Sequence, residues 1–255
     1  MQLMPTVFVG HGSPMNAIED NSHVRGWRQL AIELPEPAAI LAVSAHWYTE
    51  GTRVMDNERP RTIHDFYGFP EQLYSIVYPA PGNRELAERT KKILGDDAAL
   101  DSSWGLDHGT WSVLKAMYPI ADIPVFQVSV DRQAPAEKHL NLGKKLADLR
   151  SDGVLVLGSG NIVHNLGMID FSRNDGYDWA YQFDNYISEC LQHRDSEGII
   201  NYHSFGRSAA LAVPTPDHFY PLLYVLGAAA ETDKLHLYNQ NCIMGSLSMT
   251  SYVFA

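Results

Sequence analysis

Cysteine, positive charge and long apolar runs are all scarce in this chain of 255 residues. Its two cysteines, Cys190 and Cys242, lie far apart and outside any CxxC pair, which excludes a disulfide framework and suits a reducing compartment. The 19 basic residues are outnumbered by 30 acidic ones, and the net charge is −11. No basic stripe is available to bind a phosphate backbone, so we expect no nucleic-acid partner.

Segments that would place the protein in a membrane are also missing from the sequence. No run reaches the roughly 18 apolar residues that a membrane span needs. The first residues carry neither a basic n-region nor a long apolar h-region, so we expect a cytoplasmic protein without a membrane partner. Hydrophobic residues make up 45% of the chain, which is enough for a full core, and we expect one domain over residues 1–255.

Apolar, β-branched runs alternate with helix-like segments along the chain. Runs typical of buried strands cover residues 6–10, 38–45, 123–130 and 154–157. This alternation predicts an α/β fold with a mainly parallel central sheet flanked by helices. Residues 54–81 differ, because they are rich in proline, glycine and aromatic residues and show no clear periodicity. We expect this segment to form a flap or an irregular lobe.

Histidines follow two of the apolar runs directly. His11 comes after the run 6–10, and His46 comes after the run 38–45. In open α/β sheets, ligands bind at the carboxyl ends of the buried strands. Burying two imidazoles there without strong partners would cost several kcal/mol each, so a bound transition metal gives the simplest account. The sequence therefore predicts a metal site at this edge of the sheet.

Three further histidines lie in turns that can face the same site. His108 stands in a turn into a helix, His164 follows a buried run in a glycine-rich turn, and His218 comes after two prolines that fix the approach to a helix. His64, in the aromatic segment, is a further candidate for lining the site. The glycine-rich turn before His164 lacks the third glycine and the downstream acid of the dinucleotide fingerprint, so we expect no nucleotide cofactor.

Seven short motifs are spread over nearly the whole chain. Each motif alone is weak evidence for a family, but all seven in this order are specific. They are GHGSPM at 10–15, SAHW at 44–47, TIHDFYGFP at 62–70, YPAPG at 78–82, DHGTW at 107–111, GSGNIVHN at 158–165 and TPDHFYPLLYVLGA at 215–228. Together they resemble the class III extradiol ring-cleavage dioxygenases, the LigB superfamily, in the branch that is similar to DOPA 4,5-dioxygenase.

The resemblance implies a single α/β domain with a mixed central sheet and a mononuclear non-haem metal. It also implies that a catechol ring opens beside its hydroxyls while both atoms of O₂ are inserted. Matched motif by motif, His11, His46 and His218 would be the metal ligands. His164 would be the acid/base residue over the substrate, and His108 would be a second pocket histidine.

The third metal ligand is the point where this sequence departs from part of the class. More distant members of the class complete the site with a glutamate, whereas the matching motif here offers His218 preceded by Asp217. His218 is the ligand that the nearer branch implies. Asp217 stays open as a ligand or as a hydrogen-bond acceptor for a metal-bound imidazole, a role that carboxylates often take.

The expected ligand set selects both the substrate and the metal. Three neutral imidazoles leave a divalent ion its full +2 charge, which favours an ionised catechol bound through two oxygens. The metal must also offer a vacant position for O₂ and reach a higher oxidation state, which Fe(II) can do and Zn(II) cannot. We therefore expect Fe(II) for activity, while Zn(II), which binds nitrogen sites more tightly, can occupy the isolated protein.

Two other functions are compatible with the same residues. In a zinc-dependent hydrolase, a three-histidine site lowers the pKa of bound water to roughly 7, and His164 or His108 would shuttle the proton. A non-enzymatic metal-binding module on the same fold is the second alternative. Hydrolysis by zinc-loaded protein without O₂ would indicate the first, and a tight protein partner without any catechol complex would indicate the second.

Overall fold

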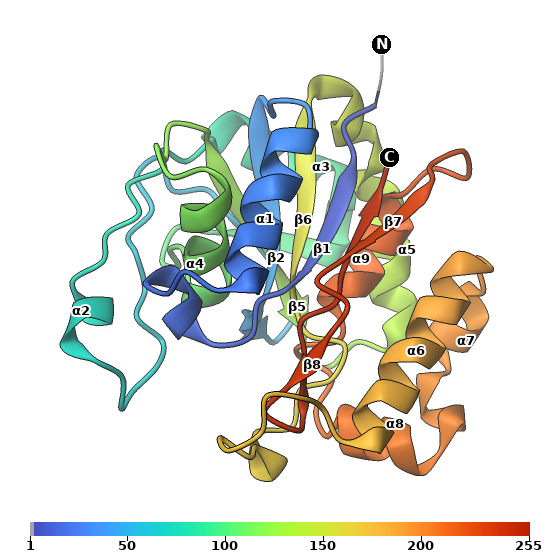
Figure 1. Cartoon of the computed structure of the whole chain (residues 1–255). Coiled ribbons are helices and arrows are strands. Elements are labelled where there is room, and N and C mark those ends of the chain that lie inside the picture. Colours follow the sequence, from blue (N-terminus) through green and yellow to red (C-terminus); the bar gives the residue numbers. More distant parts are fainter. Residues whose placement is uncertain (1–2) are drawn as a thin grey trace.

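Eight strands of the computed structural model form one sheet, and two short strands pair beside it (Figure 1). The structure describes residues 3–255, so the first two residues of the predicted 1–255 domain lie outside the described part. The strands are β1 Thr6–Gly10, β2 Ala39–Thr49, β3 Thr52–Met55, β4 Ala98–Asp101, β5 Val125–Asp131, β6 Val154–Gly160, β7 Leu235–Tyr238, β8 Cys242–Ile243, β9 Leu247–Ser248 and β10 Ser251–Phe254. The order across the large sheet is β4-β3-β5-β2-β6-β1-β10-β7.

The four central strands, β5, β2, β6 and β1, run parallel to one another. Every residue of β1, β5 and β6 is buried. A parallel strand that is covered by helices on both faces has to be apolar on both, which explains the continuous hydrophobic runs in the sequence. The predicted α/β fold with a mainly parallel sheet is confirmed. Antiparallel pairing of β3 with β5, and of β10 with β1 and β7, makes the sheet mixed.

Helices cover both faces of the sheet (Figure 1). They are α1 Ser22–Glu33, α2 Glu71–Tyr74, α3 Arg84–Leu94, α4 His108–Met117, α5 Ala136–Leu146, α6 Asp178–Gln192, α7 Ser196–Ile200, α8 Arg207–Ala212 and α9 Pro221–Ala228. Helices α1 and α4 pack together over one face, and α3, α5 and α9 lie over the other. Helices α6, α7 and α8 form a group of their own beside the sheet. Within residues 3–255, no helix combines the length and the apolar character needed to cross a membrane.

Strand β2 is longer than the sequence predicts, and it contains His46 instead of ending before it. The strand continues to Thr49, but its register against β5 shifts along the way. Val43 pairs with Val128, whereas Tyr48 pairs with Val130, so the intervening residues of β2 bulge out of the ladder. A bulge re-aims side chains at the rim of a sheet. His46 lies in this irregular stretch.

Residues 54–81 form little regular structure apart from the end of β3 and the single turn of α2. The segment is attached to the chain just before α4 by two backbone hydrogen bonds. The Ile63 N–H donates to the Leu106 carbonyl at 2.7 Å, and the Leu106 N–H donates to the Arg61 carbonyl at 2.8 Å. The irregular path agrees with the lack of periodicity in the sequence. Its action as a flap stays a prediction.

A buried arginine ties the entry to β1 to the end of α9. Arg150 is 1% exposed, and its Nη2 lies 2.8 Å from Oδ2 of Asp233. Its Nε donates to the Met4 carbonyl at 2.6 Å, and its Nη1 donates to the Ala228 carbonyl at 2.9 Å. These contacts join parts of the chain that lie more than 70 residues apart, as the separations of 146 and 78 residues show.

Replacing this arginine, Arg150→Ala, should lower the free energy of unfolding by about 3–5 kcal/mol, because the buried Asp233 carboxylate loses its partner. Chemical denaturation measures the change. Arg89→Ala is the matched control. It breaks an ion pair with Asp152 whose side chains are 43% and 40% exposed, and it should cost about 1 kcal/mol or less. Equal losses in the two variants would contradict a main supporting role for Arg150.

Candidate metal centre

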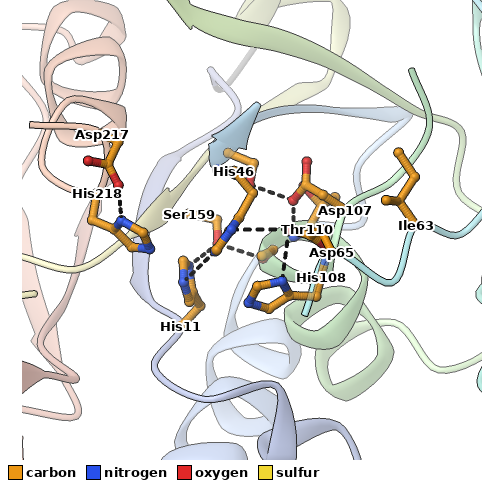
Figure 2. Close-up of polar contacts among 12 residues, drawn as sticks. His11, His46, Ile63, Asp65, Asp107, His108, Thr110, Ser159, Asp217 and His218 are labelled. Carbon is orange, nitrogen blue, oxygen red and sulfur yellow. Dashed lines mark hydrogen bonds and ion pairs between the residues drawn. The ribbon is translucent and has the colours of Figure 1, made fainter. Parts of the chain in front are cut away.

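Five histidines from distant parts of the chain converge at the carboxyl ends of β1, β2 and β6, and Figure 2 labels His11, His46, His108 and His218. They are His11 after β1, His46 in β2, His108 at the first position of α4, His164 after β6 and His218 before α9. The ring centroids of His11, His46 and His218 lie 5.0–5.2 Å from one another. The His108 ring lies 3.9 Å from the His46 ring, and the His164 ring stacks on the His218 ring at 3.4 Å. The structure therefore brings together five of the six histidines that the sequence analysis singled out.

Three of these rings offer a nitrogen to one common point. One ring nitrogen each of His11, His46 and His218 lies within 4.8 Å of the other two, a grouping that could hold a metal ion. The Nε2 atoms of His11 and His46 are 3.2 Å apart. The Nε2 atom of His218 is buried and has no hydrogen-bond partner among the described residues. Buried polar nitrogens are rarely left unpaired in this way, so the site calls for a further partner.

The opposite edge of each ring is occupied by an acceptor, which sets the tautomer. The Ser159 hydroxyl donates its hydrogen to the Gly109 carbonyl at 2.5 Å, so it must accept from His11 Nδ1, 3.0 Å away. Carboxylate oxygens, which can only accept, stand at Nδ1 of the other two ligand candidates. Asp65 Oδ2 lies 3.1 Å from His46 Nδ1, and Asp217 Oδ2 contacts His218 Nδ1 (Figure 2). All three Nδ1 atoms therefore carry a proton, and all three Nε2 atoms present lone pairs.

Converging lone pairs repel one another unless a cation lies between them. Two nitrogens held about 2.1 Å from one ion are about 3.0 Å apart at a right angle and about 3.4 Å apart at the tetrahedral angle. The observed His11–His46 separation of 3.2 Å falls between these values. Together with the orphaned His218 nitrogen, this separation fits a transition-metal ion on three imidazoles.

Burial keeps two of these imidazoles neutral. Desolvation lowers the pKa of His11 and of His218 well below the ordinary histidine value, and the neighbouring histidines lower both further. Burial also acts to lower the pKa of His46, but the hydrogen bond and the charge of Asp65 outweigh it, and the net shift is upward. Neutral imidazole is the form that binds a metal, so the environment of His11 and His218 favours coordination at neutral pH.

Asp65 is the residue of the site that the sequence analysis missed. Its Oδ2 contacts both His46 Nδ1 and, at 3.0 Å, His108 Nδ1, and its Oδ1 accepts from the His108 backbone N–H at 2.9 Å. Burial raises the cost of ionising this carboxyl, but the hydrogen bonds from His108 and His46 outweigh it and hold the pKa of Asp65 far below its usual range. The only signal in the sequence was one acid beside His64 in a mostly aromatic segment.

The bulge that carries His46 is held by a buried aspartate, Asp107. The Ser44 hydroxyl accepts from the His46 backbone N–H at 3.2 Å and donates to Asp107 Oδ1 at 2.5 Å. Asp107 is also the N-cap of α4, where its side chain accepts from the Thr110 backbone N–H. The backbone of α4 approaches closely here, since a Cβ on Gly109 would lie 2.8 Å from Cδ2 of His46. Glycine at 109 therefore leaves room for the His46 ring.

Asp217 contacts His218 as a hydrogen-bond acceptor, which is one of the two roles that the sequence left open for it. Its carboxylate contacts Nδ1 of His218, on the ring edge away from the converging Nε2 atoms (Figure 2). His64 lies apart from the cluster, because its Nε2 is within 3.0 Å of the Ile76 carbonyl in its own segment. Burial lowers the pKa of His164 to about 4, so this ring is neutral at pH 7.

Comparison with known proteins gives one family and several relatives over nearly the whole chain. A family described as the catalytic LigB subunit of aromatic ring-opening dioxygenase matches residues 5–255. The chain is 46% identical to the 4,5-DOPA dioxygenase extradiol of Escherichia coli (strain K12), over 97% of this chain and 93% of that protein. It is 38% identical to the 4,5-DOPA dioxygenase extradiol of Beta vulgaris, over 98% of this chain and 96% of that protein.

A solved structure has the same fold. The crystal structure of an uncharacterized protein from Escherichia coli K12 matches with a TM-score of 0.87 at 41% sequence identity. The match covers 99% of this chain and 100% of the other. The whole α/β domain is thus shared with that protein.

A buried carboxylate supports the turn that carries His164. Asp184 in α6 is 5% exposed and accepts from the hydroxyls of Ser248 and Thr250. Ser248 in turn donates its backbone N–H to the Val163 carbonyl at 3.0 Å, next to His164. Burial raises the pKa of Asp184 to about 6, although the two hydroxyls act against the shift.

This raised pKa predicts a pH dependence of stability. Between about pH 4 and pH 6 the native state binds more protons at Asp184 than the unfolded state, so rising pH removes stability, by about 3 kcal/mol in all. In the variant Asp184→Asn, this pH-dependent part of the free energy of unfolding should be absent. Denaturation of both proteins from pH 4 to pH 7 measures the difference, and Asp178→Asn, an exposed aspartate on the same helix, is the control. Parallel curves for wild type and Asp184→Asn would contradict the prediction.

Proposed function

The chain belongs to the LigB family of aromatic ring-opening dioxygenases, and from this premise we propose that it is an extradiol enzyme that opens a catechol ring with Fe(II) and O₂. The observation that carries the proposal is the set of three inward-facing Nε2 atoms whose rings are each fixed by an acceptor at Nδ1. Such a set holds a divalent ion without neutralising its charge. It also leaves coordination positions for other molecules.

We propose His11, His46 and His218 as the residues that hold the metal. Asp217 then acts through His218 as the hydrogen-bond acceptor of its Nδ1–H, and Ser159 does the same for His11. When bound, Fe(II) supplies the positive charge that favours a chelated, ionised catechol and the electrons that O₂ activation requires. The three imidazoles are neutral ligands, so the substrate has to bring the negative charge.

His164 and His108 remain for proton handling and for contact with the substrate. His164 is neutral at pH 7, so it enters the reaction able to take the second phenolic proton. Once protonated it can return that proton to the product side as the ring opens. His108 stands beside His46 with its Nδ1 at the Asp65 carboxylate, so its ring can donate to a developing oxyanion only through the opposite edge.

The substrate that we propose is a DOPA-like catechol. Two relatives that match nearly the whole chain, from Escherichia coli and Beta vulgaris, are named for 4,5-DOPA dioxygenase activity. The chemistry of the site asks for two adjacent hydroxyls on an aromatic ring, which DOPA provides. Other catechols meet the same requirement, because the metal selects only the aromatic ring with its two adjacent hydroxyls.

Anaerobic loading with Fe(II), followed by DOPA and air, should produce a yellow ring-opened semialdehyde with consumption of O₂. Protein loaded with Zn(II) should produce none, because zinc cannot change its oxidation state. Absorbance and an oxygen electrode record the two outcomes. If iron-loaded protein consumed no O₂ with DOPA or simple catechols, the dioxygenase proposal would be wrong. Steady ester or amide hydrolysis by zinc-loaded protein without O₂ would favour a hydrolase instead.

The roles of the histidines predict two classes of variant. His11→Ala, His46→Ala and His218→Ala should each lose bound metal, whereas His164→Ala should keep the metal and lower kcat by about 10²- to 10⁴-fold, the usual contribution of a general acid or base. Metal analysis of the dialysed proteins and steady-state rates separate the classes. Normal turnover by His164→Ala would remove this residue from the mechanism. Full metal content in any of the three other variants would remove that residue from the ligand set.

A further inference from the structure

One carboxylate, Asp65, touches two site histidines at once. Its Oδ2 is 3.1 Å from His46 Nδ1 and 3.0 Å from His108 Nδ1, and its Oδ1 accepts the His108 backbone N–H at 2.9 Å. The side chain is 18% exposed, although the residue as a whole is exposed. In Figure 2, Asp65 lies on the far side of His46 and His108 from His11 and His218.

The position of Asp65 determines which nitrogen of His46 faces the centre. An ionised carboxylate only accepts hydrogen bonds, so it keeps the proton of His46 on Nδ1 and leaves Nε2 free toward His11. Carboxylates in this position orient metal-bound imidazoles and raise their basicity, and losing one typically costs 10- to 100-fold in metal affinity. His11 relies on the Ser159 hydroxyl and His218 on the adjacent Asp217. In contrast, His46 relies on a residue 19 positions along the chain, within an irregular segment.

Removing this carboxylate disturbs both rings. The His46 and His108 rings lie 3.9 Å apart, and both Nδ1 atoms lie within 3.1 Å of the same Asp65 oxygen. Without an acceptor between them, two N–H groups would face each other in a largely buried space. One ring would then have to turn, and a turned His46 would take Nε2 away from His11.

Hydrogen bonds hold the segment around Asp65 in place, so that the carboxylate keeps its position beside His46 and His108. The Ile63 carbonyl accepts from Trp111 Nε1 at 2.8 Å, and the Ile63 N–H donates to Leu106 at 2.7 Å. The Thr62 hydroxyl accepts from the Tyr78 N–H at 2.9 Å, which closes the loop on itself. These bonds fix the backbone just before the carboxylate against the start of α4.

We propose that Asp65 is a positioning residue for the metal centre: its single carboxylate fixes His46 with Nε2 toward the metal and keeps His108 from displacing it. The inference rests on the metal site of the proposed function, and it adds that residues 54–81 are required for metal binding although they contribute no ligand. A loop that the sequence marks only as irregular thereby becomes part of the centre.

The test is the metal dissociation constant, measured at one pH and one ionic strength by competition with a chromophoric chelator, using Zn(II) and Co(II). Asp65→Asn should weaken binding of both ions by about 10- to 100-fold, and the visible spectrum of bound Co(II) should change. Asp65→Ala is the second variant. The control is Asp56→Asn, a buried carboxylate of the same segment that accepts from the Ser102 hydroxyl at 2.6 Å, and it should bind both ions within about threefold of wild type.

Thermal unfolding of each variant with and without metal separates positioning from plain stability. Positioning predicts a smaller rise in Tm on adding metal for Asp65→Asn and Asp65→Ala, whatever the Tm of the metal-free forms. Unchanged dissociation constants in these two variants would overturn the inference and leave the proposed function intact. A wild-type protein that binds no metal would overturn both. If the wild type bound a second ion that Asp65→Asn lost, Asp65 would be a ligand, which also overturns a positioning role.

Discussion

An imidazole can give a metal only one nitrogen, and the other nitrogen must find an acceptor when the ring is buried. This constraint accounts for most of the polar architecture around the centre. A serine hydroxyl takes the Nδ1–H of His11, and two carboxylates take those of His46 and His218. Because each acceptor lies outside the ring of histidines, the three Nε2 atoms have only the centre left to face.

The sheet delivers the rings to the same place. Parallel strands end on the same edge, so residues that follow or end β1, β2 and β6 become neighbours although long stretches of chain separate them. The bulge in β2 turns His46 inward, and the Asp107–Ser44 pair holds that bulge against the start of α4. Because Gly109 has no side chain, α4 can lie close to the His46 ring without a steric clash. The regular sheet thus brings the histidines to one edge, and a few residues outside the regular structure orient their rings.

Much of this arrangement could be predicted from the sequence, because it depends on patterns within short stretches of the chain. Continuous apolar runs mark buried parallel strands, and a histidine after such a run must lie near the ligand-binding edge of the sheet. His11 and His46 were found in this way, His164 also follows a buried run, and the resemblance in the ordered motifs made His218 a candidate ligand. The sequence analysis missed Asp65 because nothing near it in the chain reveals its partners.

The sequence by itself determined the α/β class, the family and the imidazoles available to the centre, because strand patterns and motifs are properties of short stretches. Only the tertiary structure decided which nitrogen of each ring faces inward. That choice depends on acceptors such as Ser159, which lies 148 residues from His11, and on a carboxylate presented by an irregular loop. Hydrogen bonds over such separations exist only once the sheet has formed, so no local pattern in the chain encodes them.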